Sequence, residues 1–506
     1  MKKFLAFSLL PLAFFLLSYM ALACWLSATY LAMQENSFFL FSFDYFYSKL
    51  PLQPALTGWI DSLLLQFFRW PLLAALLQAL IAWLTMLFLR MSLPLKGTRS
   101  LCIAMLPSLM LLLVWPLSHL LQLQVLFMAL LLFVDCRLPL WWARLTWSIL
   151  LLPLGYMLLS MPLLIVLFVL FAVAEWYVHK GRSRTLSFAG LVACALMLPP
   201  IYSQRVAFIP FQNRYSYVKG GNPLPLWDET LRQWDYYHQV VRAAEEERWA
   251  DMRSIIRESG QGRTRLMQNY LLLAESALGT LPDNLFSYTI NNPEDMLTRH
   301  NQDVQTCQFC RLFYKNLELW DESFHQAQEY SMLMPDACCF CSLTQMVDYS
   351  IREGEYAVAE KFLTILSFAP FYGRFVKEQR ERIVRSKKEQ RIERPLRADN
   401  FVGGYPFNSE MIRLIQYADG NRQRAFDYLL CGLLLQKNLP HFNTIFQSFP
   451  SLQPKTLPEP YAQAFRLLQT NGQVPDDECL PGSYYYYFKC VAIPEPNQQM
   501  RQSAGH

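Results

Sequence analysis

Residues 72–89, LLAALLQALIAWLTMLFL, carry no charged side chain and are long enough to form one membrane-spanning helix. A span needs about 20 mainly apolar residues, because the hydrocarbon core is about 30 Å thick and each helical residue rises about 1.5 Å. Outward from this stretch, turns at Pro116–His119 and between Pro153 and Pro162 divide two longer apolar runs into pairs of spans. The sequence predicts about seven transmembrane helices within residues 1–203: residues 4–33, 72–89, two in 101–134, two in 139–178, and 185–201.

Charge predicts the orientation of these spans. Of the 45 Lys and Arg residues, 12 lie in the first 200 positions, with only 5 of the 40 Asp and Glu residues. Short cytoplasmic loops are enriched in Lys and Arg. With Lys2 and Lys3 inside, seven spans place all the short basic loops on the cytoplasmic side: Arg90–Arg99, Arg137–Arg144 and Lys180–Arg184. We therefore expect an inner-membrane protein with a cytoplasmic N-terminus and a periplasmic C-terminal part. Residues 2–24 also have the layout of a cleaved signal peptide, which would leave this topology unchanged.

One outer loop, residues 34–61, is much longer than the others. It reads QENSFFLFSFDYFYSKLPLQPALTGWID and contains Glu35, Asp44 and Asp61 among many aromatic residues. This mixture favours an interfacial anchor in the headgroup layer. The alternative is a catalytic or ligand-binding loop, because an acid held at a membrane surface can act as a general base or bind a divalent metal ion.

Beyond residue 225 the pattern changes from apolar runs to amphipathic helices. Aromatic residues open a predicted second helix at Trp249, Phe286, Trp320 and Tyr356, with spacings of 37, 34 and 36 residues. Such a period, close to 34 residues, is typical of helix-turn-helix repeats. The sequence therefore predicts stacked helical hairpins over residues 230–372, in which no single unit buries its own apolar face.

The clearest of these units resembles the second half of a tetratricopeptide repeat. Its Gly354, Tyr356, Ala359, Phe362 and Pro370 match the family's Gly, Tyr, Ala, Phe and closing Pro. The resemblance implies a repeat array that offers a binding surface to a protein or peptide.

The remaining segments complete an all-α prediction. The last 306 residues contain 33 basic and 35 acidic side chains, so net charge gives no argument for nucleic-acid binding. The charged segment 373–400 favours a solvated helix or linker, with a phosphate or anionic-lipid contact as the alternative. The aromatic run Tyr484–Phe488 suits a short strand or an aromatic cap. The other predicted segments are a linker at 204–229, a helical region at 401–492 and a disordered tail at 493–506.

Eight cysteines lie in the predicted extracytoplasmic part. Paired thiolates suit tetrahedral zinc, and the candidate ligands are Cys307, Cys310, Cys339 and Cys341. Their place in the repeat favours the buried core instead, and disulfides are a third alternative, as they are for Cys479 and Cys490. No phosphate loop, dinucleotide fingerprint or nucleophile elbow occurs, so the sequence predicts no cofactor, and a divalent metal ion only if the outer acids catalyse.

Several stretches together resemble a bacterial family of multi-pass membrane proteins of unknown function, with a tetratricopeptide-like C-terminal region. They are ENSFFLFSFDYFYSKL, LLLQFFRWPLLAALLQALI, NYLLLAESALG, DNLFSY, EYAVAEKFLTIL and FYGRF. The resemblance implies a membrane location and a helical region, and it transfers no activity.

Two hypotheses for function follow. The favoured one is a membrane-tethered scaffold of the cell envelope, whose outer helical repeats bind a protein or peptide partner. The alternative is an enzyme, similar to polytopic glycosyltransferases that use lipid-linked sugars, in which Glu35 or Asp44 aligns a metal ion or deprotonates an acceptor.

Overall fold

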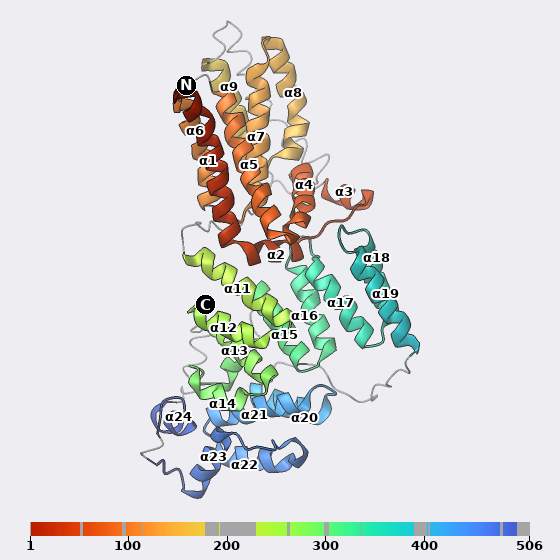
Figure 1. The fold of residues 1–506 in the computed structure, drawn as a ribbon. Coiled ribbons are helices and arrows are strands. Elements are labelled where there is room, and N and C mark those ends of the chain that lie inside the picture. The colour runs from red at the N-terminus through yellow and green to blue at the C-terminus, as the bar shows by residue number, and fades with distance from the viewer. Residues whose placement is uncertain are drawn as a thin grey trace. The chain divides into compact units, whose positions relative to one another are not determined.

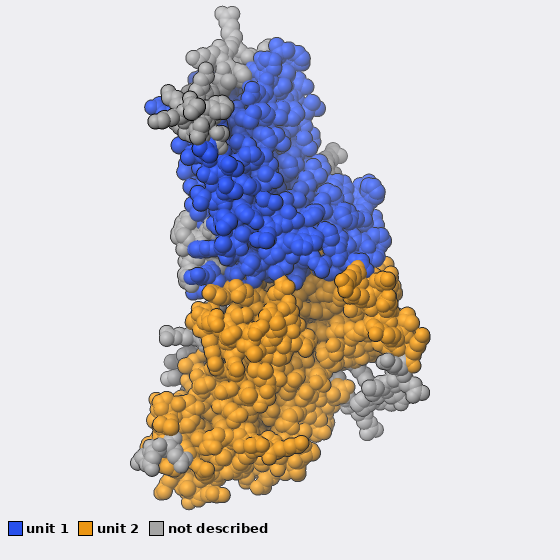
Figure 2. All heavy atoms as spheres, in the orientation of Figure 1, with its two compact units in different colours: residues 1–235, 365–373 blue, residues 236–364, 374–506 orange. Residues whose placement is uncertain are grey.

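The computed structural model divides into two compact units (Figure 2). The N-terminal unit comprises residues 1–235 and 365–373, and the C-terminal unit comprises residues 236–364 and 374–506. Every regular element among the described residues is a helix, which confirms the all-α class for that part of the chain. The described residues are 2–50, 54–93, 98–114, 116–177, 192, 229–260, 264–297, 303–334, 336–388, 402, 405–475 and 479–492.

Some predicted segments lie outside the described residues. They are the linker 204–229 (apart from Glu229), residues 389–400 of the charged segment, the tail 493–506, and the span 185–201 apart from one residue.

Long apolar helices form the N-terminal unit (Figure 1). Helix α5 packs against α1, α6 and α7, and α9 packs against α7 and α8. The predicted breaks are present, because Pro116 lies between α6 and α7, and Ser160 lies between α8 and α9. The helices are α1 (Lys2–Trp25), α5 (Pro71–Ser92), α6 (Thr98–Val114), α7 (His119–Arg137), α8 (Trp141–Leu158) and α9 (Met161–Tyr177).

Among the described residues of this unit, two helices, α5 and α7, are long and apolar enough to cross a membrane. Helix α1 continues after a 76° bend into α2 (Ser27–Glu35), and this bent pair would be a third candidate span. Helices α6 and α9 are also apolar, but their described apolar parts are shorter. Large hydrophobic side chains such as Leu17, Leu150 and Val169 are exposed on the outside of the bundle, as expected for helices that are apolar all round.

Short helices gather at the end of the bundle where α1 ends and α5 begins. The predicted outer loop forms two of them, α3 (Phe43–Lys49) and α4 (Ala55–Leu65), and η1 (Gln66–Arg69) follows α4. The N-terminus of α2 has no cap from its own N-cap residue, Leu26. Asp235 replaces it, because its carboxylate accepts hydrogen bonds from the backbone N–H and the hydroxyl of Thr29, both at 2.8 Å.

Residues 365–373 belong to the N-terminal unit although they lie far along the chain. The Phe41 N–H donates to the Phe368 carbonyl at 2.9 Å, and Arg69 Nη1 donates to the Phe371 carbonyl at 3.2 Å. The Phe371 ring packs edge-on against Trp70, with 5.1 Å between centroids. Sequence periodicity predicted most of these residues to lie in the repeat region 230–372. Periodicity contains no information on which distant segment a loop contacts, so it could not predict this packing.

The C-terminal unit contains the last part of α11 and a succession of shorter helices. Tyr484–Phe488 lies in a helix, so the strand alternative is wrong, and the charged segment begins as helix α19. The elements are α11 (Glu229–Glu245), α12 (Trp249–Glu258), α13 (Arg265–Leu278), α14 (Leu281–Asn284), η4 (Leu285–Ser287), η5 (Pro293–Met296), α15 (Val304–Asn316), α16 (Trp320–Met332), α17 (Phe340–Arg352), α18 (Tyr356–Ser367), α19 (Gly373–Lys388), α20 (Phe407–Tyr417), α21 (Arg422–Leu435), α22 (Leu439–Ser448), η6 (Pro450–Leu452), α23 (Glu459–Gln469) and α24 (Tyr484–Cys490).

Five helix pairs of this unit are joined by the same turn. In each turn one residue has a left-handed backbone, the next helix begins two residues later, and the intervening N–H donates to the carbonyl five residues before it. Helices accordingly begin at Trp249, Trp320 and Tyr356, as expected. The helix expected at Phe286 begins at Leu281 instead, and the fifth turn leads into α22 at Leu439. The left-handed residues are Glu247, Gly279, Glu318, Gly354 and Lys437.

Candidate functional site

Asp61 of the predicted outer loop meets His119 inside the N-terminal unit. Asp61 lies on α4, and His119 is the first residue of α7. The Asp61 Oδ1 atom is hydrogen-bonded to His119 Nδ1. Both groups are well buried, since the His119 side chain is 2% exposed and that of Asp61 is 14% exposed. The ring of Phe68 packs edge-on against the imidazole, with 5.1 Å between centroids.

This pairing leaves one imidazole nitrogen for chemistry. A carboxylate on Nδ1 fixes the orientation of the ring. The His119 Nε2 atom is buried and has no hydrogen-bond partner among the described residues. An imidazole held by a carboxylate, with its other nitrogen unused, is the arrangement that supports general acid–base catalysis.

A polar layer surrounds the pair at this end of the bundle. The Tyr30 hydroxyl donates to Gln78 Oε1 at 2.5 Å, and Gln78 Nε2 donates to the Pro116 carbonyl. The Gln66 Nε2 atom donates to Ser37 Oγ at 2.9 Å, whereas the buried Gln66 Oε1 has no partner within the described part of the chain. Buried polar atoms are costly unless they are hydrogen-bonded. Both His119 Nε2 and Gln66 Oε1 are buried without a described partner at this end of the bundle. We therefore regard this end as a candidate site.

The other two acids of the outer loop lie elsewhere. Glu35 is the last residue of α2 and is partly exposed, and Asp44 is exposed in the first turn of α3. A carboxylate at that position is favourable next to the positive end of the helix dipole, which accounts for Asp44 without catalysis. Within the described ranges, no group of three or more His, Cys, Asp or Glu side chains is placed to hold a metal ion.

Sequence reasoning missed His119 as a partner of Asp61 and treated it only as part of a turn. The available signal was a single histidine in the uncharged stretch 101–134. Such a residue needs a polar partner when it is buried, but sequence alone does not identify that partner.

A second buried ionic group lies at the opposite end of the bundle. The Arg144 guanidinium pairs with the Glu175 carboxylate, and its Nη1 atom donates to the Leu138 carbonyl at 2.9 Å. Asp135, on the last turn of α7, is also buried. Helical rise puts Asp135 about 24 Å from His119 along α7. The sequence counted Arg144 among the loop charges, whereas the structure buries it.

The four candidate zinc ligands divide between two clusters of the C-terminal unit. Cys307, Cys339 and Cys341 pack around Tyr330, whereas Cys310 lies in the main core. Within the described residues Cys307, Cys339 and Cys490 are free thiols, so no disulfide joins Cys490 to Cys479. Burial raises the pKa of the Cys307 thiol to about 11. A protonated thiol is a poor metal ligand, so this environment favours the buried-core interpretation.

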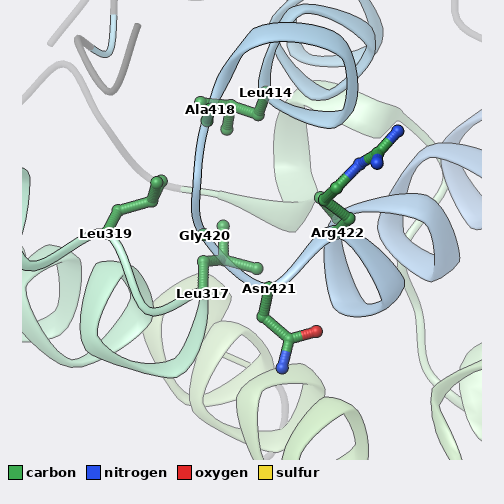
Figure 3. Close-up of a pocket in the computed structure, with 8 residues that line it drawn as sticks. Leu317, Leu319, Leu414, Ala418, Gly420, Asn421 and Arg422 are labelled. Carbon is green, nitrogen blue, oxygen red and sulfur yellow. The ribbon is translucent and has the colours of Figure 1, made fainter. Parts of the chain in front are cut away.

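A small hollow separates two loops of the same unit. Figure 3 shows Leu317 and Leu319 of the loop after α15 together with Ala418 and Gly420 of the loop before α21. The hollow has a volume of about 10 Å³, which is the space of one water molecule. It is a close contact between loops and not a ligand site.

Comparison with known proteins identifies the family of the chain, but it assigns no activity. Neither the curated proteins nor the solved structures contain a match. A family model described as "Family of unknown function (DUF6057)" matches residues 2–483, which is nearly the whole chain. The protein that carries the Asp61–His119 pair is therefore a member of the DUF6057 family.

Proposed function

We propose that the protein is a multi-pass membrane protein of the cell envelope, whose C-terminal unit is a tetratricopeptide-like scaffold for a protein or peptide partner on the outer side. The observation that carries the scaffold proposal is the turn that five helix pairs share. The first four of these turns, at Glu247, Gly279, Glu318 and Gly354, recur every 32 to 39 residues. A turn repeated at such spacing makes successive hairpins similar in geometry, so that they stack and present one continuous surface. Such surfaces commonly bind peptides or helices.

The ends of the apolar helices support the membrane location. In the described part of the N-terminal unit, four tryptophans are exposed, at the ends of α1, α8 and α9 and just before α5. Trp25 and Trp70 lie at the end that contains His119, and Trp142 and Trp176 lie at the other end. Exposed tryptophans at both ends of an apolar bundle are typical of the two membrane interfaces.

Site-specific photocross-linking tests the scaffold. Met332, at the end of α16, has a side chain that is 73% exposed and apolar, and Leu333 beside it is 43% exposed. A photoreactive residue at Met332 in the native cell is expected to form an adduct with one envelope protein, and Leu333→Asp should abolish it. The same probe at the exposed, polar Glu258 is the matched control.

The adduct alone is not sufficient, so the partner identified by mass spectrometry is then purified and its affinity for the full chain is measured. Binding that Leu333→Asp weakens supports the scaffold. Equal adducts at Met332 and Glu258, or no binding between the purified proteins, would contradict it.

The Asp61–His119 pair favours a second candidate, an enzyme that transfers a sugar from a lipid carrier. In this function His119 Nε2 removes the proton from an acceptor hydroxyl as the hydroxyl oxygen bonds to the anomeric carbon of the sugar and the carrier phosphate departs, and Asp61 orients the ring. The acid that takes part is Asp61 and neither Glu35 nor Asp44.

Envelope glycan profiles of the native strain distinguish these acids. Asp61→Asn and His119→Gln are expected to remove the same glycan while protein abundance is unchanged. Glu35→Gln and Asp44→Asn, which alter acids of the same loop without touching the pair, are the matched controls. Unchanged glycans in both site variants would eliminate the enzyme and leave the scaffold unaffected.

A further inference from the structure

The N-terminal unit contains an apolar cavity of about 290 Å³ between α5, α6, α7 and α9. Its lining includes Ala104 and Pro107 of α6, Met128 and Leu132 of α7, and Val173 of α9. Ala104 and Pro107 have small side chains, which do not fill the space between the helices.

The cavity is open on the outer surface of the bundle. Ile103 and Val173 both line it, and their side chains are 50% and 45% exposed. Among the described lining residues, only Ser92 has a hydroxyl, and it already donates to the Phe88 carbonyl at 2.8 Å. Water needs two or more polar partners, so it is a poor occupant of this space.

We infer that the cavity binds the hydrocarbon chain of a membrane lipid. A cavity of about 150 Å³ already accommodates benzene, so this larger one has room for a chain segment. A protein helix, about 10–12 Å in diameter, does not fit in that volume. The inference rests on the membrane location proposed above, since lipid chains are then the medium that faces Ile103 and Val173.

The site recognises the chain and not a headgroup. No charged side chain lines the cavity in the described part of the unit. Arg144 is engaged by Glu175 and by the Leu138 carbonyl. Recognition therefore depends on apolar area and shape, and the ligand class is a phospholipid acyl chain.

The test uses the purified full-length protein in lipid nanodiscs that contain a phospholipid with a photoreactive diazirine on its acyl chain. Met128 and Leu132 are each 9% exposed, so a chain labels them only from within the cavity. Leu150, which is 64% exposed on α8, reports ordinary contact with the surrounding lipid. We expect labelling at all three residues.

Filling the cavity provides the decisive comparison. Ala104→Phe should abolish labelling of Met128 and Leu132 and leave that of Leu150 unchanged, and Leu150→Phe, outside the cavity, is the matched control. If Ala104→Phe is not monodisperse in size-exclusion chromatography, Ala174→Leu occupies the same cavity with a smaller side chain. Labelling of Leu150 without Met128 or Leu132 in the wild type, or persistent labelling in the filled variants, overturns the inference.

Two further outcomes separate this inference from the proposal on which it depends. If Leu150 is unlabelled as well, the membrane location itself is wrong. A photoreactive residue at Ile103 that cross-links to residues 178–201 of the same chain would identify a protein occupant, and the lipid proposal would then fail.

Discussion

At the scale of single residues, Gly420 decides how closely two loops of the C-terminal unit approach each other. A Cβ atom there would lie 2.5 Å from the Leu317 carbonyl oxygen and 2.7 Å from Leu319 Cδ2. That carbonyl accepts a hydrogen bond from the Asn421 N–H at 2.7 Å and cannot move away without losing it.

We expect Gly420→Ala to lower the free energy of unfolding by about 1–3 kcal/mol, because the added methyl group overpacks the contact. The measurement is the midpoint of urea unfolding of the purified protein. Gly373→Ala is the control, since a Cβ atom there meets nothing within 4 Å. Equal midpoints for the two variants would show that the loops can separate at no cost.

Glu275 is a buried carboxylate that depends on its hydrogen bonds. It accepts them from the Thr280 hydroxyl at 2.5 Å, the Asn284 amide at 2.7 Å and the Tyr288 hydroxyl at 2.6 Å. Burial alone raises the pKa of Glu275, but these donors and the Arg253 guanidinium outweigh burial and hold the pKa below 4.5.

This lowered pKa predicts how stability depends on pH. Because the pKa is lower in the folded than in the unfolded chain, the carboxylate stabilises the fold above about pH 4.5, and the contribution disappears as pH falls through the folded pKa. Glu275→Gln should therefore melt below the wild type at neutral pH, with a gap that narrows in acid. The exposed Glu258→Gln provides the baseline, and a gap that stays constant with pH contradicts the prediction.

At the scale of elements, the recurring left-handed turn carries a measurable strain. Its φ angle is 77° at Gly354 and 60° at Glu318. A side chain in this conformation costs about 1–2 kcal/mol, whereas glycine adopts it readily.

Gly354→Ala should consequently lower the free energy of unfolding by about 1 kcal/mol, and Glu318→Gly should change it in the stabilising direction. The thermal unfolding midpoint of each variant, compared with the wild type, shows whether the substitution stabilises or destabilises the protein. Glu353→Ala, one position earlier and at a φ of −77°, is the control for loss of a side chain next to this turn. If Gly354→Ala and Glu318→Gly shift the unfolding midpoint in the same direction, strain does not govern the turn.

At the scale of the whole molecule, the proposed topology predicts which residues an impermeant reagent reaches. In a variant whose exposed native cysteines are serine, Lys49→Cys and Glu258→Cys should react with an impermeant maleimide in intact spheroplasts. Arg90→Cys should react only after the membrane is permeabilised. The reverse pattern would invert the orientation, and reaction of all three without permeabilisation would exclude a membrane-spanning bundle.

Local patterns accounted for the helices and failed at the contacts between them. Proline and apolar periodicity predicted the breaks near Pro116 and Pro162, because both signals come from neighbouring residues. The start expected at Phe286 was wrong, since the turn at Gly279 begins the helix five residues earlier. An aromatic residue alone does not define a helix start, and here the helix follows the left-handed turn at Gly279.

Composition and spacing along the chain were sufficient for the all-helical class of the described residues and for the apolar N-terminal helices. These properties sum contributions from residues that are close in sequence, so they can be computed without a fold. Only the tertiary structure brought Asp61 to His119 across 58 positions and Asp235 to Thr29 across 206. Such pairs arise because a buried polar group must find a partner, and the packing of the helices determines which partner is within reach.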